Sequence, residues 1–147
     1  MQVNLNNQME VIGIIEAVIQ ATCLIYDTLK AVSNFYNNGK SNRGCLSALR
    51  DKLCILHQYY DELGPELKHY REEQGASKPH GLVAIMNRHL VSLQETLQLV
   101  NDQINGDTER GRTFQASPIS EKQVKSLILR IDKEDTEVRH IMTILRE

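Results

Sequence analysis

Two Glu-x-x-His motifs give this chain of 147 residues its clearest potential for chemistry. In di-iron carboxylate proteins, two helices of a bundle each carry such a motif, and two other helices each add a glutamate, all pointing inward. This chain has both motifs and two further glutamates in separate apolar segments: Glu66 with His69, Glu137 with His140, Glu16 and Glu95. The residue types therefore permit a dinuclear metal centre, provided that they face one core.

The helical positions of these residues argue against that metal centre. Successive residues of an α-helix are rotated by about 100°, so the angle between each residue and the apolar stripe can be counted. Glu66 and His69 lie about 70° and 130° from the stripe of their segment, and Glu137 and His140 lie about 90° and 150° from theirs. Glu95 points away from the core, and the connection before its segment is shorter than a ferritin-like crossover. We therefore predict solvated faces, with no metal site and no cofactor.

Other arrangements of reactive residues are weaker. Cys54 and His57 are one helical turn apart, but no third group is indicated that would orient the histidine as a base. His89 stands beside the core position Leu90, and it is predicted to be a histidine at the core boundary rather than a ligand. The sequence contains no glycine-rich phosphate loop and no nucleophile-elbow or zinc-protease motif. The sequence therefore predicts no catalytic residues, and we expect that the protein is not an enzyme.

The composition indicates one globular domain. Hydrophobic residues make up 41% of the chain and charged residues 24%, which is typical of a folded domain. The net charge of -2 differs from the strongly basic balance of a dedicated nucleic-acid binder, so no nucleic-acid partner is expected. Cys23, Cys45 and Cys54 have unrelated spacings without a Cys-x-x-Cys pair. We expect free thiols in a reducing cytoplasm.

Four amphipathic helices must position all of these residues. Apolar residues recur every three and four positions rather than in alternation. This pattern predicts a flexible arm over 1–7 and helices over about 8–37, 44–72, 79–105 and 118–147. Because the connections are short, the expected fold class is all-α, an antiparallel up-down-up-down four-helix bundle. One core should include apolar residues of all four helices: Val18, Ile25, Leu53, Leu56, Leu93, Leu97 and Ile131.

Local signals refine these helices. Pro65 predicts a kink rather than a break in the second helix, because the apolar stripe continues in phase across it. Ser117 followed by Pro118 predicts the start of the fourth helix. The stripe of that helix lapses at Glu134 and Asp135, which predicts that its middle is its least buried part.

The segment MEVIGIIEAVIQATCLIY, residues 9–26, is the most apolar part of the chain. Its apolar run, interrupted by Glu10 and Glu16, is shorter than the roughly 18–20 residues that a membrane span requires. Its apolar arc is nevertheless wider than one seam of a bundle needs, which predicts a helix that is core at rest and membrane-seeking once the bundle opens. The residues assigned to this membrane-seeking helix are Ile12, Ile14, Ile15, Val18 and Ile19.

Two groups of basic residues accompany the first and third connections, which lie at the same end of an antiparallel bundle. Anionic lipid headgroups attract such groups by about 1 kcal/mol for each Lys or Arg near the surface. The alternative, basic residues scattered over an ordinary solvated surface, stays open. The candidate lipid-binding residues are Lys40, Arg43, Arg50, Lys52, Arg110, Arg112, Lys122 and Lys125.

The helix order and three stretches of sequence together resemble a known family. The stretches are MEVIGIIEAVIQ near the N-terminus, IMNRHLVSLQETLQLVNDQI and GRTFQASPISEKQVKSLILRI. They are similar to the N-terminal four-helix executioner domain of mixed-lineage-kinase-domain-like pseudokinases, within the HeLo and HeLo-like group of cell-death domains. The resemblance covers about residues 9–147 and rests on layout, since the group has no invariant catalytic signature.

This resemblance implies an effector of regulated, necroptosis-like cell death in innate immunity. An attached sensor or kinase-like domain would hold it inactive, so the chain is expected to be the N-terminal part of a longer protein. On release it would oligomerise, bind anionic phospholipids, including phosphoinositides, and permeabilise the plasma membrane. It would thus be cytoplasmic at rest and at the plasma membrane when activated. The alternative is a helical protein-interaction or signalling module without lipid activity.

Overall fold

Four long helices make up the described part of the chain. The computed structural model describes the backbone of residues 2–38, 43–74, 81–113 and 119–146, and the side chains of 12–37, 44–70, 81–104 and 119–146. Within these ranges there is no strand, and the helices are α1 (Gln2–Asn38), α2 (Arg43–Gln74), α3 (Gly81–Thr113) and α4 (Glu121–Arg146). The predicted fold class, an all-α four-helix bundle, is confirmed.

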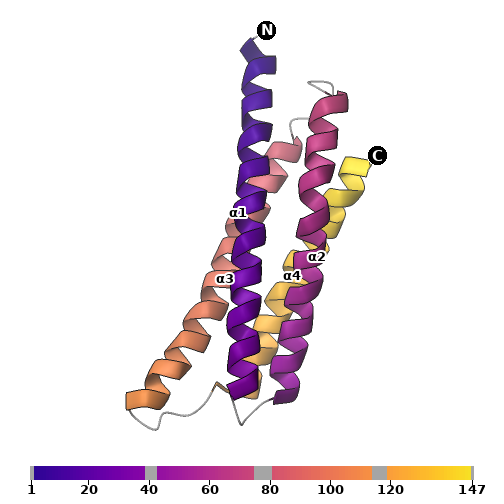
Figure 1. Cartoon of the computed structure of the whole chain (residues 1–147). Coiled ribbons are helices and arrows are strands. Elements are labelled where there is room, and N and C mark those ends of the chain that lie inside the picture. The colour runs from indigo at the N-terminus through magenta and orange to yellow at the C-terminus, as the bar shows by residue number, and fades with distance from the viewer. Residues whose placement is uncertain (1, 39–42, 75–80, 114–118, 147) are drawn as a thin grey trace.

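The helices alternate in direction along the chain, but neighbours in sequence are not always neighbours in space. In Figure 1, α1 and α3 run away from the end marked N, and α2 and α4 run back toward it. Both α1 and α4 pack against α2 and α3, whereas over the described residues α2 and α3 lie diagonally across the core. Each helix therefore has one antiparallel and one parallel neighbour, and α3 and α4 form an antiparallel pair.

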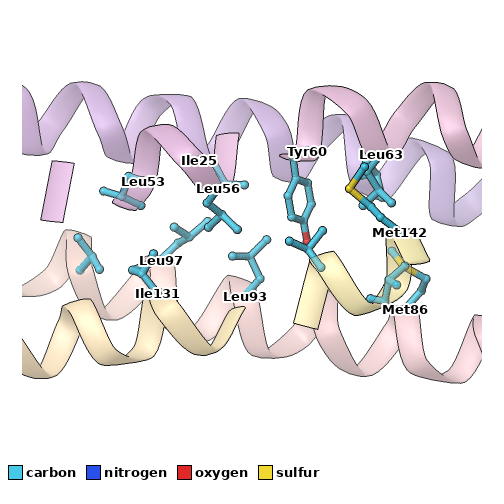
Figure 2. Close-up of a cluster of buried hydrophobic side chains, with 14 of the residues drawn as sticks. Ile25, Leu53, Leu56, Tyr60, Leu63, Met86, Leu93, Leu97, Ile131 and Met142 are labelled. Atoms are coloured by element: carbon cyan, nitrogen blue, oxygen red, sulfur yellow. The ribbon is translucent and has the colours of Figure 1, made fainter. Parts of the chain in front are cut away.

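All four helices contribute to one apolar core. Figure 2 shows Leu53 and Leu56 of α2 extending toward Leu97 of α3 and Ile131 of α4. The seven residues predicted to share the core are all buried: Val18, Ile25, Leu53, Leu56, Leu93, Leu97 and Ile131. This part of the prediction is confirmed, because the three- and four-residue spacing of large apolar side chains fixes the inward face of each helix.

Two helices are longer than the sequence pattern suggested. α1 begins at Gln2, where a flexible arm was expected, because residues 2–7 contain no Pro or Gly that would oppose a helix. α3 continues to Thr113 rather than ending near residue 105, since Gly106 and Gly111 each oppose a helix by only about 1 kcal/mol. Pro65 lies inside α2, which continues through it without a break.

The start of α4 is fixed by a reciprocal capping box. Ser120 Oγ accepts a hydrogen bond from the backbone N–H of Gln123 at 3.1 Å, and Gln123 Oε1 accepts one from the backbone N–H of Ser120 at 2.8 Å. This pair satisfies two donors that a helix start leaves without a partner. The predicted start signal at Ser117 and Pro118 lies outside the described residues, and the helix itself begins at Glu121.

Truncation of Leu56 tests the packing of α2. Leu56 is fully buried, whereas its neighbour Ile55 is 40% exposed. Leu56→Ala should lower the free energy of unfolding by about 2–5 kcal/mol, because it removes buried methyl groups and leaves a cavity. Ile55→Ala, the matched control, should lower it by less than about 1 kcal/mol. Denaturant titration measures both values, and equal losses would contradict the assigned inward face of α2.

Candidate functional site

The basic residues at the start of α2 are engaged with neighbouring groups. The Arg50 guanidinium lies 4.6 Å from the centre of the Tyr36 ring of α1. Lys52 Nζ lies 2.8 Å from Asp132 Oδ1 of α4, and this hydrogen bond and charge raise the pKa of Lys52. Because α2 and α4 are parallel neighbours, this ion pair joins them at the same depth along the bundle. Lys52 is therefore less available to an anionic ligand than its sequence position suggests.

The basic residues at the start of α4 differ from each other. Lys125 Nζ lies 3.0 Å from Glu121 Oε1 one turn earlier, whereas Lys122 is exposed. The first turns of α2 and α4 and the last turns of α3 lie at the same end of the molecule (Figure 1). The side chains of the remaining candidate lipid-binding residues lie outside the described side chains: Lys40, Arg43, Arg110 and Arg112.

The membrane-seeking candidates of α1 range from core to surface. Val18, Ile14 and Ile15 are buried, Ile12 is half-buried and Ile19 is 50% exposed. The helical segment Ile12–Asn37 is long and apolar enough to cross a membrane, although 28% of its apolar window is buried in the bundle. Length and composition alone do not distinguish a membrane span from the core helix of a bundle, so the expectation that the run is too short for a span stays a prediction.

An apolar groove lies along the surface where α1 packs against α3. It has a volume of about 280 Å³, and small side chains on α1 leave it open beside leucines of α3. Its lining residues are Ala17, Gln20, Ala21, Leu24, Leu90, Leu93, Gln94 and Leu97. The groove offers an apolar surface without a reactive group of its own.

In the structure, Asp61 lies beside His57, the histidine one helical turn from Cys54. His57 Nδ1 lies 3.5 Å from Asp61 Oδ2, so a group that the sequence did not indicate does orient this ring. Over the described residues, however, no hydrogen bond joins Cys54 to His57. The Asp61 side chain is 58% exposed, and exposed ion pairs of this kind are weak. The described contacts therefore orient the imidazole ring of His57 without linking it to the Cys54 thiol.

The two Glu-x-x-His motifs do not form a dinuclear site. Four of the six candidate ligands are exposed at the surface: Glu16, His69, Glu95 and His140. Glu66 Oε1 accepts a hydrogen bond from Arg146 Nε at 3.2 Å. Only Glu137 joins a polar cluster, and its partners lie outside the motifs.

This polar cluster lies between α3 and α4. His89, Ser92 and Thr96 share one face of α3, because their spacing of three and four residues follows the helical repeat. His89 Nδ1 lies 3.0 Å from Glu137 Oε2 and 3.3 Å from Glu134 Oε2. Glu134 Oε1 accepts hydrogen bonds from Ser92 Oγ at 2.5 Å and from Thr96 Oγ1 at 3.2 Å. The cluster thus connects the antiparallel pair α3 and α4 through side chains alone.

The cluster is buried at its centre and open on one side. His89 and Glu134 are 2% and 1% exposed, whereas the Glu137 side chain is 37% exposed. On the core side, the Tyr60 ring of α2 lies 5.9 Å from the His89 ring. On the outer side lies an open cleft of about 400 Å³ with polar and apolar walls, lined by Ile85, Arg88, His89, Ser92, Lys133, Glu137, His140 and Ile141.

The charges within the cluster stabilise one another. Burial lowers the pKa of His89, but the hydrogen bonds and charges of Glu134 and Glu137 raise it by more, so this pKa stands above its ordinary value of 6.5. Burial raises the pKa of Glu134, but His89, Ser92 and Thr96 lower it by more, so this pKa stands below its ordinary value of 4.5. Mildly acidic pH therefore favours a protonated His89 beside an ionised Glu134.

Two sequence-based interpretations are wrong at this cluster. His89, predicted at the core boundary, and Glu134, predicted in the least buried part of its helix, are both buried. The sequence does contain a signal for the burial of Glu134. This residue stands three positions after Ile131 and four before Val138, so it occupies a position of the apolar stripe of α4. The stripe therefore does not lapse at Glu134, because a buried carboxylate takes the place of an apolar side chain.

Stability should pass through a maximum at mildly acidic pH. The contribution of His89 is complete below its unfolded-state pKa of about 6.5 and is lost as the pH rises through its higher folded-state pKa. The contribution of Glu134 is complete above its unfolded-state pKa of about 4.5 and is lost as the pH falls through its lower folded-state pKa. Tyr60, which faces the cluster from α2, stays neutral, because burial raises its pKa well above 10.0.

Denaturant titrations across this pH range, with a chelator present, measure the effect. The free energy of unfolding should decline on both sides of the interval between about 4.5 and 6.5. The variant His89→Gln should lose the decline above that interval while keeping other pH effects of the chain. A decline of equal size in this variant would show that His89 is not its source.

Comparison of the chain with protein-family models, with curated proteins and with solved structures finds no match.

Proposed function

We propose that this chain is a membrane-permeabilising effector domain that binds anionic phospholipids and oligomerises on activation. The observation that carries this proposal is the dual character of α1. The helix has the length and apolar composition of a membrane span, yet it packs in the bundle with one side toward solvent, where Ile19 and Tyr26 are 50% and 53% exposed. A released α1 could bury both this face and the face now packed on α2 and α3 at the lipid boundary.

Electrostatic capture would precede the opening of the bundle. Lys122 is exposed and Arg50 is half-buried at the end where the first turns of α2 and α4 meet. A negatively charged leaflet would concentrate the protein at its surface through such residues. Arg50, Lys52 and Lys125 would contribute less than Lys122, because each has an acidic partner. The domain would thus be cytoplasmic at rest and would reach the plasma membrane after release from a regulatory sensor or kinase-like domain.

A second function, a helical interaction module without lipid activity, is favoured by the groove between α1 and α3. Its apolar walls and its volume of about 280 Å³ suit side chains of a partner helix. This function requires the bundle to stay closed, since α1 forms one wall of the groove. The two functions therefore differ in whether α1 leaves its neighbours.

Dye leakage from vesicles tests the proposed function. Vesicles containing phosphatidylserine and phosphoinositide should leak on addition of the chain, whereas vesicles of phosphatidylcholine alone should not. Lys122→Glu with Lys125→Glu should weaken binding to the anionic vesicles and make the remaining binding less sensitive to salt. Lys68→Glu, at an exposed position near the other end of α2, is a control for a single charge reversal away from this end of the bundle. Absence of leakage from anionic vesicles would favour the interaction module.

A further inference from the structure

The polar cluster between α3 and α4 has the residue types and the spacing of a metal site. One ligand atom each from His89, Glu134 and Glu137 lies within 4.8 Å of the other two. His89 Nδ1 stands 3.3 Å from one carboxylate oxygen and 3.0 Å from the other. A tetrahedral ion with bonds of about 2.0–2.2 Å holds its ligand atoms about 3.3–3.6 Å apart. Small side-chain movements would therefore bring all three atoms to bonding distance of one ion.

Glu134 supplies an independent reason to place a cation here. Its Oε1 is held by the hydroxyl groups of Ser92 and Thr96, which fixes the plane of the carboxylate. Its Oε2 is buried, and among the described residues its partner is His89 Nδ1 at 3.3 Å. Nδ1 can carry a single proton, and Glu137 Oε2 at 3.0 Å lies closer to it than Glu134 Oε2 at 3.3 Å. A carboxylate that is anchored through one oxygen and presents the other to a histidine nitrogen is an arrangement found at metal ligands with second-shell hydrogen bonds.

The net charge of the polar cluster also favours a bound cation. With a protonated His89, the three residues His89, Glu134 and Glu137 carry one net negative charge, and of the two carboxylates Glu134 is the one shielded from water. With a neutral His89 and a divalent ion, the three residues and the ion together are neutral. The partly exposed Glu137 and the adjacent cleft give an ion a route from solvent and leave room for a water molecule.

We propose that His89 Nδ1, Glu134 Oε2 and Glu137 Oε2 bind one divalent first-row transition-metal ion, with Zn²⁺ as the best match and a water molecule from the cleft as fourth ligand. Mixed imidazole and carboxylate ligands suit Zn²⁺ in a four-coordinate shell. The bound ion joins α3 to α4 and leaves α1 untouched. This site is therefore independent of the lipid activity proposed above.

Titration of chelator-treated protein with Zn²⁺ tests the site. Calorimetry should give one ion per chain, with release of a proton at mildly acidic pH as the metal replaces it on His89. Saturating Zn²⁺ should raise the melting temperature, and Co²⁺ should give the visible absorption of a four-coordinate nitrogen and oxygen site. Glu134→Gln and Glu137→Gln should each weaken Zn²⁺ binding by at least about tenfold. Glu95→Gln, an exposed site on α3, is the charge-matched control.

The results of these titrations distinguish binding at the polar cluster from binding elsewhere on the chain. Loss of binding in both cluster variants with binding retained in the control supports the site. If Glu134→Gln does not fold by circular dichroism, the partly exposed Glu137→Gln decides alone. Binding that is equal in Glu137→Gln and in the parent chain, or a Co²⁺ spectrum dominated by thiolate bands, assigns the ion to another place such as a cysteine and overturns the proposal. Absence of stoichiometric Zn²⁺ binding overturns it as well, and leaves a protonated His89 as the cation of the cluster.

Discussion

Replacing His89 with Leu should lower the free energy of unfolding by about 3–5 kcal/mol near pH 6, out of roughly 5–15 kcal/mol for a typical domain. The substitution removes the positive partner of Glu134 and leaves a carboxylate that is 1% exposed without a counter-charge. A buried charge without a partner destabilises a fold far more than the intact pair stabilises it. The size of the effect therefore reports the environment of Glu134 rather than the packing of the imidazole ring.

A double substitution separates these two causes. His89→Leu combined with Glu134→Leu should recover most of the lost stability, because apolar residues of similar volume replace a buried ion pair at little net cost. Ser92 and Thr96 lose an acceptor in this variant, but their hydroxyl groups can bond to the preceding turn of α3. Denaturant titration of both single variants and the double variant completes a thermodynamic cycle. A double variant as unstable as the sum of the singles would show that the residues do not interact.

Tying α1 to α2 should abolish vesicle leakage while leaving the fold and lipid binding intact. The rings of Tyr26 on α1 and His57 on α2 are 5.8 Å apart, so thiols placed there lie within reach of a short cleavable cross-linker. If α1 must leave the bundle to enter the lipid boundary, the cross-linked protein cannot permeabilise vesicles. We expect a fall in leakage rate of at least about tenfold, with full recovery when the cross-link is cleaved. The starting protein should lack Cys23, Cys45 and Cys54.

A second cross-link provides the matched control for this experiment. Lys52 of α2 and Asp132 of α4 lie in direct contact at 2.8 Å, so Lys52→Cys with Asp132→Cys ties two helices without restraining α1. This protein should still permeabilise anionic vesicles. If the α1 cross-link leaves leakage unchanged, α1 acts only as a core helix. Equal inhibition by both cross-links would instead mean that the whole bundle must loosen.

Sequence reasoning identified the helices and the core because large apolar side chains at helical spacing determine both. Leu53, Leu56 and Leu97 are buried as predicted, since each continues an apolar stripe that has one energetically favourable direction. Spacing alone did not identify the cluster, because Glu134 occupies a core position with a polar side chain. Its burial depends on Ser92, Thr96 and His89, which approach from another helix. Only the pairing of α3 with α4 reveals these contacts, and one-dimensional periodicity contains no information on helix pairing.

The diagonal placement of α2 and α3 divides the bundle into two hairpins, α1 with α2 and α3 with α4. One peptide connection joins the hairpins, and over the described residues the contacts between them are those of α1 with α3 and of α2 with α4. Two copies that exchanged hairpins would form these same contacts between chains instead of within one chain. The ion pair of Lys52 with Asp132 would then become intermolecular. Assembly by this exchange would need no new complementary surface, and its rate would depend on how often the two hairpins separate.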